Sequence, residues 1–251
     1  STFSDYTMGL VPLFILMGAV AVTSGMSGEL FRAAQLWLGN FRGGLAVATV
    51  ASCGGFAAIC GSSAATAATM TRVALPEMKK HGYSERLATG VIAAGGTLGV
   101  LIPPSIALAV YGLLTQQSVG LLFMAGVVPG IIAIAMYMLV VKVWLAVRPQ
   151  DAPVGQQAAM RERLSSLTRL GPIMLLILFV IGGIYGGLFT PTEAGAVGAA
   201  GAIAIVALGK RLSWKTLFSS LAESVRMGAA ILLIMAGAVL FGYFLAVTET
   251  P

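Results

Sequence analysis

Long apolar stretches, separated by short clusters of charged residues, dominate the chain. A helix needs about 20 apolar residues to cross the hydrocarbon core of a bilayer. Residues 87–141 alone carry no Asp, Glu, Lys, Arg or His and are long enough for two crossings. The pattern therefore predicts an all-α polytopic membrane protein, whose uncharged stretches cover residues 8–28, 43–71, 87–114, 120–141, 170–192, 194–209 and 227–248.

Composition excludes a water-soluble fold. Hydrophobic residues make up 58% of the chain and charged residues only 10%, with a mean hydropathy of +0.94, whereas soluble domains carry roughly 25% charged residues. The net charge of +6 does not indicate nucleic-acid binding, because no run of basic residues stands apart from an apolar segment. Cys53 and Cys60 would lie about 10 Å apart along a helix axis, too far for a disulfide, so we predict two free buried thiols.

The positions of the basic residues predict the topology, because Lys and Arg stay mainly in cytoplasmic loops. Residues 8–28 would cross inward and lead to an interfacial helix from Glu29 to Arg42. The spans 87–114, 170–192 and 227–248 would run outward, and the spans 120–141 and 194–209 inward. Residues 142–169 would form a cytoplasmic loop. This path puts all 15 Lys and Arg inside and leaves three acidic residues outside, Asp5, Glu193 and Glu249.

Residues 43–71 require a different path. Arg42 precedes this uncharged stretch, and Arg72, Lys79 and Lys80 follow it. A single crossing would leave one of these basic groups outside. We therefore predict a re-entrant helical hairpin that enters and leaves on the cytoplasmic side, with its turn at Cys60-Gly61-Ser62-Ser63.

A weak internal similarity suggests an inverted repeat. Residues 10–20 and 229–239 share several identities, among them Gly18 with Gly237 and Ala19 with Ala238. The two segments would run in opposite directions, as inverted repeats require. By this offset, the second copy of the hairpin would begin beyond Pro251, so we expect one full repeat and the start of another. The predicted organisation is 1–42, 43–141, 142–169, 170–226 and 227–251.

Two segments break helical rules inside the membrane. The first is the hairpin turn and the Ser, Thr and Ala residues that follow it. An unwound turn at membrane depth survives only where protein buries it or where it lines a wet cavity. Such turns can hold a desolvated cation between hydroxyls and carbonyls. The alternative is that these small residues merely permit close helix packing.

The second segment lies within the span 87–114. Pro103 and Pro104 remove backbone donors and interrupt the helix, which Gly95 and Gly96 would already loosen. A broken helix opposite a re-entrant hairpin is the arrangement from which transporter sites are built. A simple proline kink is the alternative.

The sequence GSSAATAATMTRVALPEMKKHGYSERLATGVIAAGGTLGVLIPPSIALAVYG, Gly61 to Gly112, closely resembles the large membrane subunit of tripartite ATP-independent periplasmic (TRAP) transporters. LFMAGVVPG from Leu122 and GLFTPTEAGAVGA from Gly187 extend the resemblance, and PLFILMG from Pro12 fits the segment before the first hairpin. The resemblance implies an inverted-repeat, elevator-type symporter of the bacterial inner membrane. Sodium would drive the uptake of organic acids, such as C4-dicarboxylates or sialic acid, delivered by a periplasmic substrate-binding protein. A small four-helix membrane subunit, separate or fused, would accompany it.

The resemblance also implies site residues, with Na⁺ as the coupling ion and no other cofactor. The residues that would bind the coupling ion are Ser62, Ser63, Thr66, Gly95, Gly96 and Thr97. Those that would shape the substrate site are Gly61, Thr69, Pro103, Pro104 and Ser105. The chain departs from the family pattern because it lacks the second hairpin and its own broken helix, which would supply the rest of the ion sites.

Other functions have less support in the sequence. A channel-like or scaffolding membrane protein without a coupled ion is the main alternative. An intramembrane serine protease would need a base near Ser62, but the only histidine, His81, falls in the predicted cytoplasmic connection. His81, Lys79 and Lys80 are most simply a solvated basic loop. Glu193, three residues after Thr190, suits a helix cap better than a proton-coupling role. We therefore predict that the protein is not an enzyme.

Overall fold

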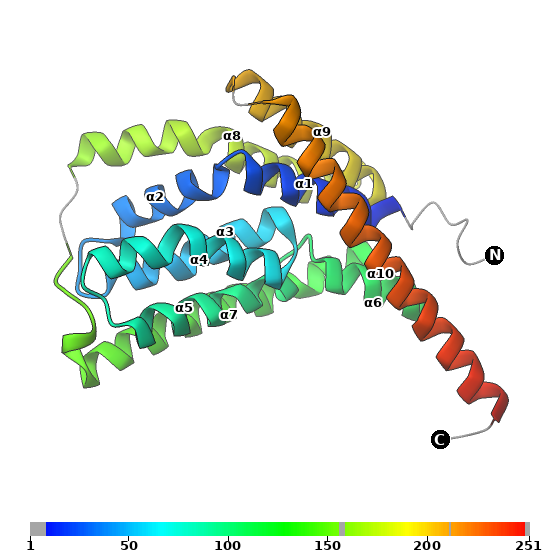
Figure 1. Ribbon diagram of the computed structural model, residues 1–251, viewed down its shortest axis with the longest axis horizontal. Helices are drawn as coiled ribbons and strands as arrows, with labels where there is room; N and C mark the ends of the chain where they lie inside the picture. Colours follow the sequence, from blue (N-terminus) through cyan, green and yellow to red (C-terminus); the bar gives the residue numbers. More distant parts are fainter. Residues whose placement is uncertain (1–8, 156–158, 211, 249–251) are drawn as a thin grey trace.

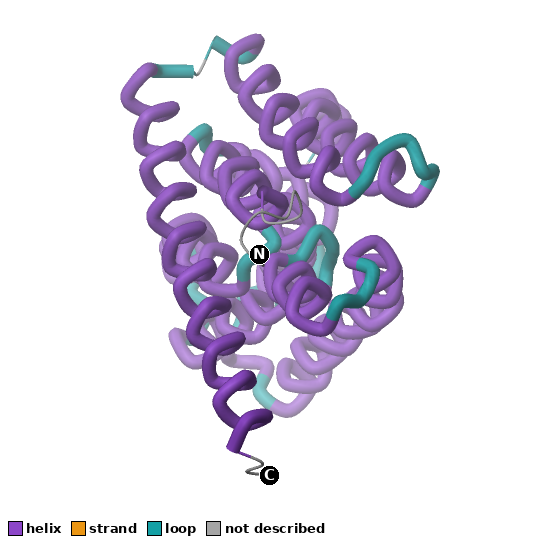
Figure 2. Tube along the Cα trace, turned by 90° about the vertical axis from the view of Figure 1, so that its right-hand side faces the viewer, coloured by secondary structure: helices purple, strands orange, loops and turns teal. Residues whose placement is uncertain are grey.

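The computed structural model describes residues 9–155, 159–210 and 212–248. In this part of the chain all regular structure is helical and there is no strand (Figures 1 and 2). The predicted all-α class is therefore confirmed. The elements are α1 (Leu10–Thr23), α2 (Met26–Leu38), α3 (Gly44–Cys60), α4 (Ser63–Lys80), α5 (Glu85–Leu101), α6 (Ile106–Thr115), α7 (Val119–Val147), the short 3-10 helix η2 (Pro149–Asp151), α8 (Met160–Tyr185), α9 (Pro191–Leu208) and α10 (Trp214–Thr248).

Length and apolar composition identify the helices that can cross a membrane. Five helical segments of the described chain qualify, namely α5 with α6, α7, α8, α9 and α10. The pair α1 and α2 qualifies only if it is taken as one bent span. These helices indicate that the chain is a multi-pass membrane protein. The predicted positions of Asp5, Arg211 and Glu249 lie outside the described residues.

The first predicted span, residues 8–28, differs from the structure at its end. Helix α1 stops at Thr23, and the chain bends by 67° into α2. Gly25 adopts the left-handed conformation, with φ 79°, which is accessible to glycine at little cost. Helix α2 begins three residues before the interfacial helix that we expected and buries Leu30 and Phe31 while Arg32 stays exposed. The bend lets α2 pack against α3 and α8.

Helices α3 and α4 form a helical hairpin in the middle of the bundle, as expected (Figure 1), while its re-entry from one side of the membrane stays a prediction. Helix α3 is buried on nearly all sides, with Phe56 fully inaccessible. It packs against α1, α2, α5 and α7. Helix α4 is longer than expected, because it continues past residue 71 to Lys80. Arg72 is therefore part of this helix, about 12 Å from its end.

Helix α10 crosses the bundle diagonally and packs on α1 (Figure 1). The Thr23 and Ser220 hydroxyls lie 2.9 Å apart, and the Ser224 hydroxyl donates to the Pro12 carbonyl at 2.7 Å. These contacts show that the two helices run in opposite directions. That direction agrees with the predicted inverted repeat, which itself stays a prediction. Helix α10 begins at Trp214. Most of the cytoplasmic connection that we expected before residue 227 is therefore part of this helix.

Candidate functional site

The turn of the hairpin is made by two residues. Gly61 ends α3 in the left-handed conformation, with φ 59°. Ser62 begins α4 as its N-cap, and its hydroxyl accepts the Ala65 N–H at 3.3 Å. Such a cap satisfies one of the amide groups that a helix start leaves unpaired. The turn thus falls within the predicted Cys60–Ser63 segment, and local backbone chemistry explains why it forms there.

The break between α5 and α6 lies at residues 102–105. Pro103 and Pro104 cannot donate backbone hydrogen bonds. Ser105 is fully buried and joins the two half-helices, because its hydroxyl donates to the Val100 carbonyl at 2.7 Å and accepts the Leu108 N–H at 3.3 Å. Gly95 and Gly96 were expected to loosen the helix, but α5 stays helical through both to Leu101. The prolines alone therefore mark the interruption.

The hairpin turn and the helix break are in direct contact. The Ile106 N–H, at the start of α6, donates to the Gly61 carbonyl at 3.0 Å. A Cβ atom added at Gly61 would lie 2.2 Å from the Pro104 carbonyl oxygen. One added to Gly99 would lie 2.6 Å from the backbone of Ser62. Only glycine allows backbones to approach this closely. The structure thus brings the two predicted interruptions together.

The three hydroxyls expected to face an ion have different surroundings. Thr66 is fully buried, and its hydroxyl donates to the Ser62 carbonyl at 2.8 Å and lies 3.1 Å from Cys60 Sγ. The Ser62 hydroxyl serves as the cap described above. Ser63 is half-buried, and within the described chain its hydroxyl has no hydrogen-bond partner. Ser63 is therefore the hydroxyl most available to a ligand.

The three candidate residues on α5 face three different neighbours. A Cβ on Gly95 would meet Cys53 Sγ at 2.5 Å, and one on Gly96 would meet Ala67 Cβ at 2.8 Å. The Thr97 hydroxyl instead lies 2.8 Å from the Tyr137 hydroxyl of α7. Gly95 and Gly96 hold α5 close to the hairpin, while Thr97 points to a different side. The role of Tyr137 could not be predicted, because nothing in the sequence pairs it with Thr97.

Thr69, the last residue of the predicted tip, is buried about one turn beyond Thr66. The tip also lacks charged side chains, since none occurs in residues 43–71 or 87–141. In the described residues no group of His, Cys, Asp and Glu could hold a metal ion. Any cation here would be bound by neutral oxygens, which suits a monovalent ion that must bind and leave.

The partial charges at this site come from the ends of helices. The C-terminal ends of α3 and α5 and the N-terminal ends of α4 and α6 meet at the contact between turn and break. Helix C-termini carry partial negative charge and N-termini partial positive charge. A cation is therefore favoured beside the first pair and a carboxylate beside the second, as in discontinuous transporter helices.

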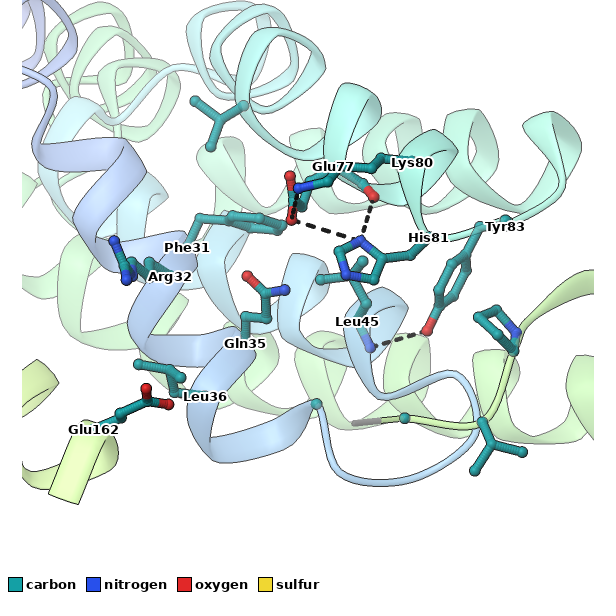
Figure 3. Close-up of a pocket in the computed structure, with 16 residues that line it drawn as sticks. Phe31, Arg32, Gln35, Leu36, Leu45, Glu77, Lys80, His81, Tyr83 and Glu162 are labelled. Atoms are coloured by element: carbon teal, nitrogen blue, oxygen red, sulfur yellow. Dashed lines mark hydrogen bonds and ion pairs between the residues drawn. The ribbon is translucent and has the colours of Figure 1, made fainter. Parts of the chain in front are cut away.

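The other end of the hairpin has a charged cavity of about 910 Å³ between α2, α4 and residues 153–155 (Figure 3). His81 lies beside Glu77, with Nδ1 2.8 Å from the Glu77 carbonyl oxygen and 3.5 Å from the carboxylate. Lys80 Nζ lies 3.7 Å from the same carboxylate. Lys79 and Lys80 belong to the last turn of α4 rather than to the expected loop. This charged end anchors the hairpin.

Tyr83 closes the base of the hairpin. Its hydroxyl accepts the Leu45 N–H at 3.2 Å, at the start of α3, where no side chain of α3 caps the helix (Figure 3). Burial raises the pKa of the Tyr83 hydroxyl, so it stays protonated at neutral pH. This contact could not be predicted from the sequence, because the two residues lie 38 positions apart.

Two further structural predictions are confirmed. Thr190 and Glu193 form a capping box at the start of α9, with Pro191 in the first turn. Cys53 and Cys60 are free and buried.

Comparison with known proteins identifies one family. The whole chain, residues 1–251, matches the family described as "Tripartite ATP-independent periplasmic transporter, DctM component". It is 38% identical over 251 residues to a C4-dicarboxylate TRAP transporter large permease protein of Pseudomonas aeruginosa, covering 100% of this chain and 58% of the relative. A protein of the same name from Vibrio cholerae is 43% identical over 194 residues, which are 77% of this chain and 42% of that protein.

A relative with a different named substrate also matches nearly the whole chain. The sialic acid TRAP transporter permease protein of Haemophilus influenzae is 32% identical over 246 residues, covering 98% of this chain and 40% of the relative. The chain thus spans about half the length of the relatives that it matches.

Proposed function

The chain belongs to the DctM component of the tripartite ATP-independent periplasmic transporters, and from this premise we propose that it supplies half of a sodium-coupled site for organic acids. Members of the family are membrane permeases rather than enzymes, and they lie in the inner membrane. The coupling ion would be Na⁺, held near Ser62, Ser63 and Thr66 at the hairpin turn.

The contact between the Gly61 carbonyl and the Ile106 amide carries the proposal. It joins two helix interruptions, so carbonyl-rich and amide-rich helix ends lie within one neutral, buried region. Carbonyls and the Ser63 hydroxyl are suited to bind Na⁺, and the amide ends of α4 and α6 favour a carboxylate. Ser63 would contact the ion directly. Thr97 would instead hold α5 against α7 through its contact with Tyr137.

The proposed substrate is an organic carboxylate. Relatives are named for C4-dicarboxylate, isethionate, ectoine and sialic acid, so family membership does not select one of them. No charged side chain lies in the turn or the break. We therefore assign much of the specificity to a periplasmic binding protein, which would deliver the substrate with the help of a small membrane subunit.

The test is uptake by the complete permease with its small subunit and binding protein in proteoliposomes. Labelled C4-dicarboxylate and sialic acid would be offered with an inward Na⁺ gradient, and with K⁺ in its place as the control. We expect accumulation above equilibrium with Na⁺ only. A channel-like protein would equilibrate substrate without accumulation in either buffer, and that result would contradict the proposal.

A further inference from the structure

A second cavity lies away from the hairpin turn, in a groove between α5 and α7. These two helices run side by side along one edge of the bundle (Figure 1). The groove has a volume of about 330 Å³. Its floor is made of buried Val50, Leu87, Val91 and Val141. Apolar side chains therefore line most of its length.

The shape of the groove depends on small residues. Gly90 and Ala94 lie on its α5 wall, and a Cβ on Gly90 would meet no atom of the described residues within 4 Å. From Arg86 to Ala94 the wall extends for about 12 Å. The hydrogen bond between Tyr137 and Thr97 crosses from α7 to α5 just beyond Ala94. The groove is thus mainly apolar, with one polar cross-link at one end.

The open end of the groove carries positive charge. Arg86 lines it, is exposed and forms no ion pair with any described residue. The Arg148 guanidinium lies 5.3 Å from the centre of the Trp144 ring, which also lines the groove. Asp151 is the acidic group at this end, and it accepts the Trp144 indole N–H at 2.7 Å. The neighbouring Glu85 is paired with Lys79 at 2.6 Å.

We propose that this groove binds one acyl chain of an anionic phospholipid, whose phosphate lies against Arg86. An apolar slot that ends in unpaired cationic charge complements a molecule with an apolar tail and an anionic head. Trp144 lines the groove beside Arg148, and aromatic side chains are enriched where headgroups meet hydrocarbon. The groove shares Tyr137 with the support proposed for the transport site, but its tests measure lipid retention rather than uptake, so either proposal can fail without the other.

Native mass spectrometry of the complete permease tests the proposal. The protein would be offered phosphatidylglycerol or phosphatidylcholine with identical acyl chains. We expect preferential retention of phosphatidylglycerol. Arg86→Gln should reduce that preference roughly fivefold, whereas Arg72→Gln, which removes the same charge from α4 outside the groove, should leave it unchanged. Equal retention of both lipids by the parent protein would contradict the role of the headgroup.

Filling the groove tests the acyl chain. Gly90→Leu should abolish retention of either lipid, while Thr89→Leu, at an adjacent exposed position outside the groove, should not. A photoreactive amino acid in place of Val140 should crosslink to lipid in membranes. Crosslinking to another segment of the permease or to a second copy would show that protein covers the groove and would overturn the proposal. Unchanged lipid retention in Gly90→Leu would overturn it as well.

Discussion

The two ends of the α3–α4 hairpin use opposite chemistry. At the turn, charged side chains are absent, and backbone contacts such as Ile106 N–H to Gly61 carbonyl hold the chain. At the base, Glu77 lies among Lys80 and His81 beside a large cavity. The turn is therefore a rigid neutral region in which carbonyls and hydroxyls are the available ligands. Helix ends also meet at the base, where α4 ends and α3 and α5 begin, but there charged side chains rather than neutral oxygens surround them.

This difference predicts where small changes have large effects. Contacts at the turn join backbone to backbone, so an added methyl group cannot be accommodated by rotation of a flexible side chain. The ion pairs at the base join partly exposed side chains and contribute little, and the buried Tyr83 hydrogen bond is the stronger contact there. Substitutions at the turn should therefore cost more than those at the base.

Gly61→Ala should have the largest effect. Alanine in the left-handed conformation costs about 1–2 kcal/mol, and the clash with the Pro104 carbonyl adds about 1–3 kcal/mol. Thermal unfolding of the purified protein measures the loss. Gly25→Ala is the matched control, because Gly25 also has a positive φ but open space around its Cβ position. Equal destabilisation of the two variants would show that the contact between turn and break is unimportant.

Ser105→Ala should have the next largest effect. It removes a buried hydroxyl that links the two half-helices, at a cost of about 1–3 kcal/mol. Ser118→Ala serves for comparison, since Ser118 caps α7 in the same way but is exposed, and should cost about 0.5–1 kcal/mol. Thermal unfolding of both proteins under the same conditions measures the difference. If the exposed cap proved as costly, Ser105 would be an ordinary cap.

Tyr83→Phe should have a smaller effect, confined to the base. The Leu45 N–H would lose its acceptor, at a cost of about 1 kcal/mol. Hydrogen exchange of the amides at the start of α3 should quicken, while the Na⁺ dependence of uptake stays unchanged. A shift in Na⁺ dependence would mean that base and turn are coupled, contrary to the comparison above.

Much of this organisation could be predicted from the sequence. The charge on either side of residues 43–71 predicted the hairpin, and Gly61 with Ser62 predicted its turn, because both depend on local rules. Pro103 and Pro104 likewise predicted the break. Helix ends were harder to predict, since α4 continues past Arg72 to Lys80. Polar residues near a membrane surface fit a helix as well as a loop.

Contacts between distant segments could not be predicted. Gly95 and Gly96 suggested a loosened helix, but tertiary packing against the hairpin keeps them helical. The sequence also grouped Thr97 with Gly96, although these neighbours face different helices because successive helical residues point about 100° apart. The roles of Tyr137 and Tyr83 depend on partners far along the chain.

The central claim, that the hairpin turn binds the coupling ion, is tested most directly by the Na⁺ concentration for half-maximal uptake. It would be measured for Ser63→Ala and Thr66→Ala in the complete reconstituted system. Ser52→Ala is the control, because it removes a buried hydroxyl of α3 that bonds only to Ala48. We predict that the first two variants raise this concentration about 5-fold to 150-fold, which corresponds to roughly 1–3 kcal/mol per lost ligand, and that the control leaves it unchanged. Unchanged Na⁺ dependence in both turn variants would contradict the account and leave these residues with a packing role.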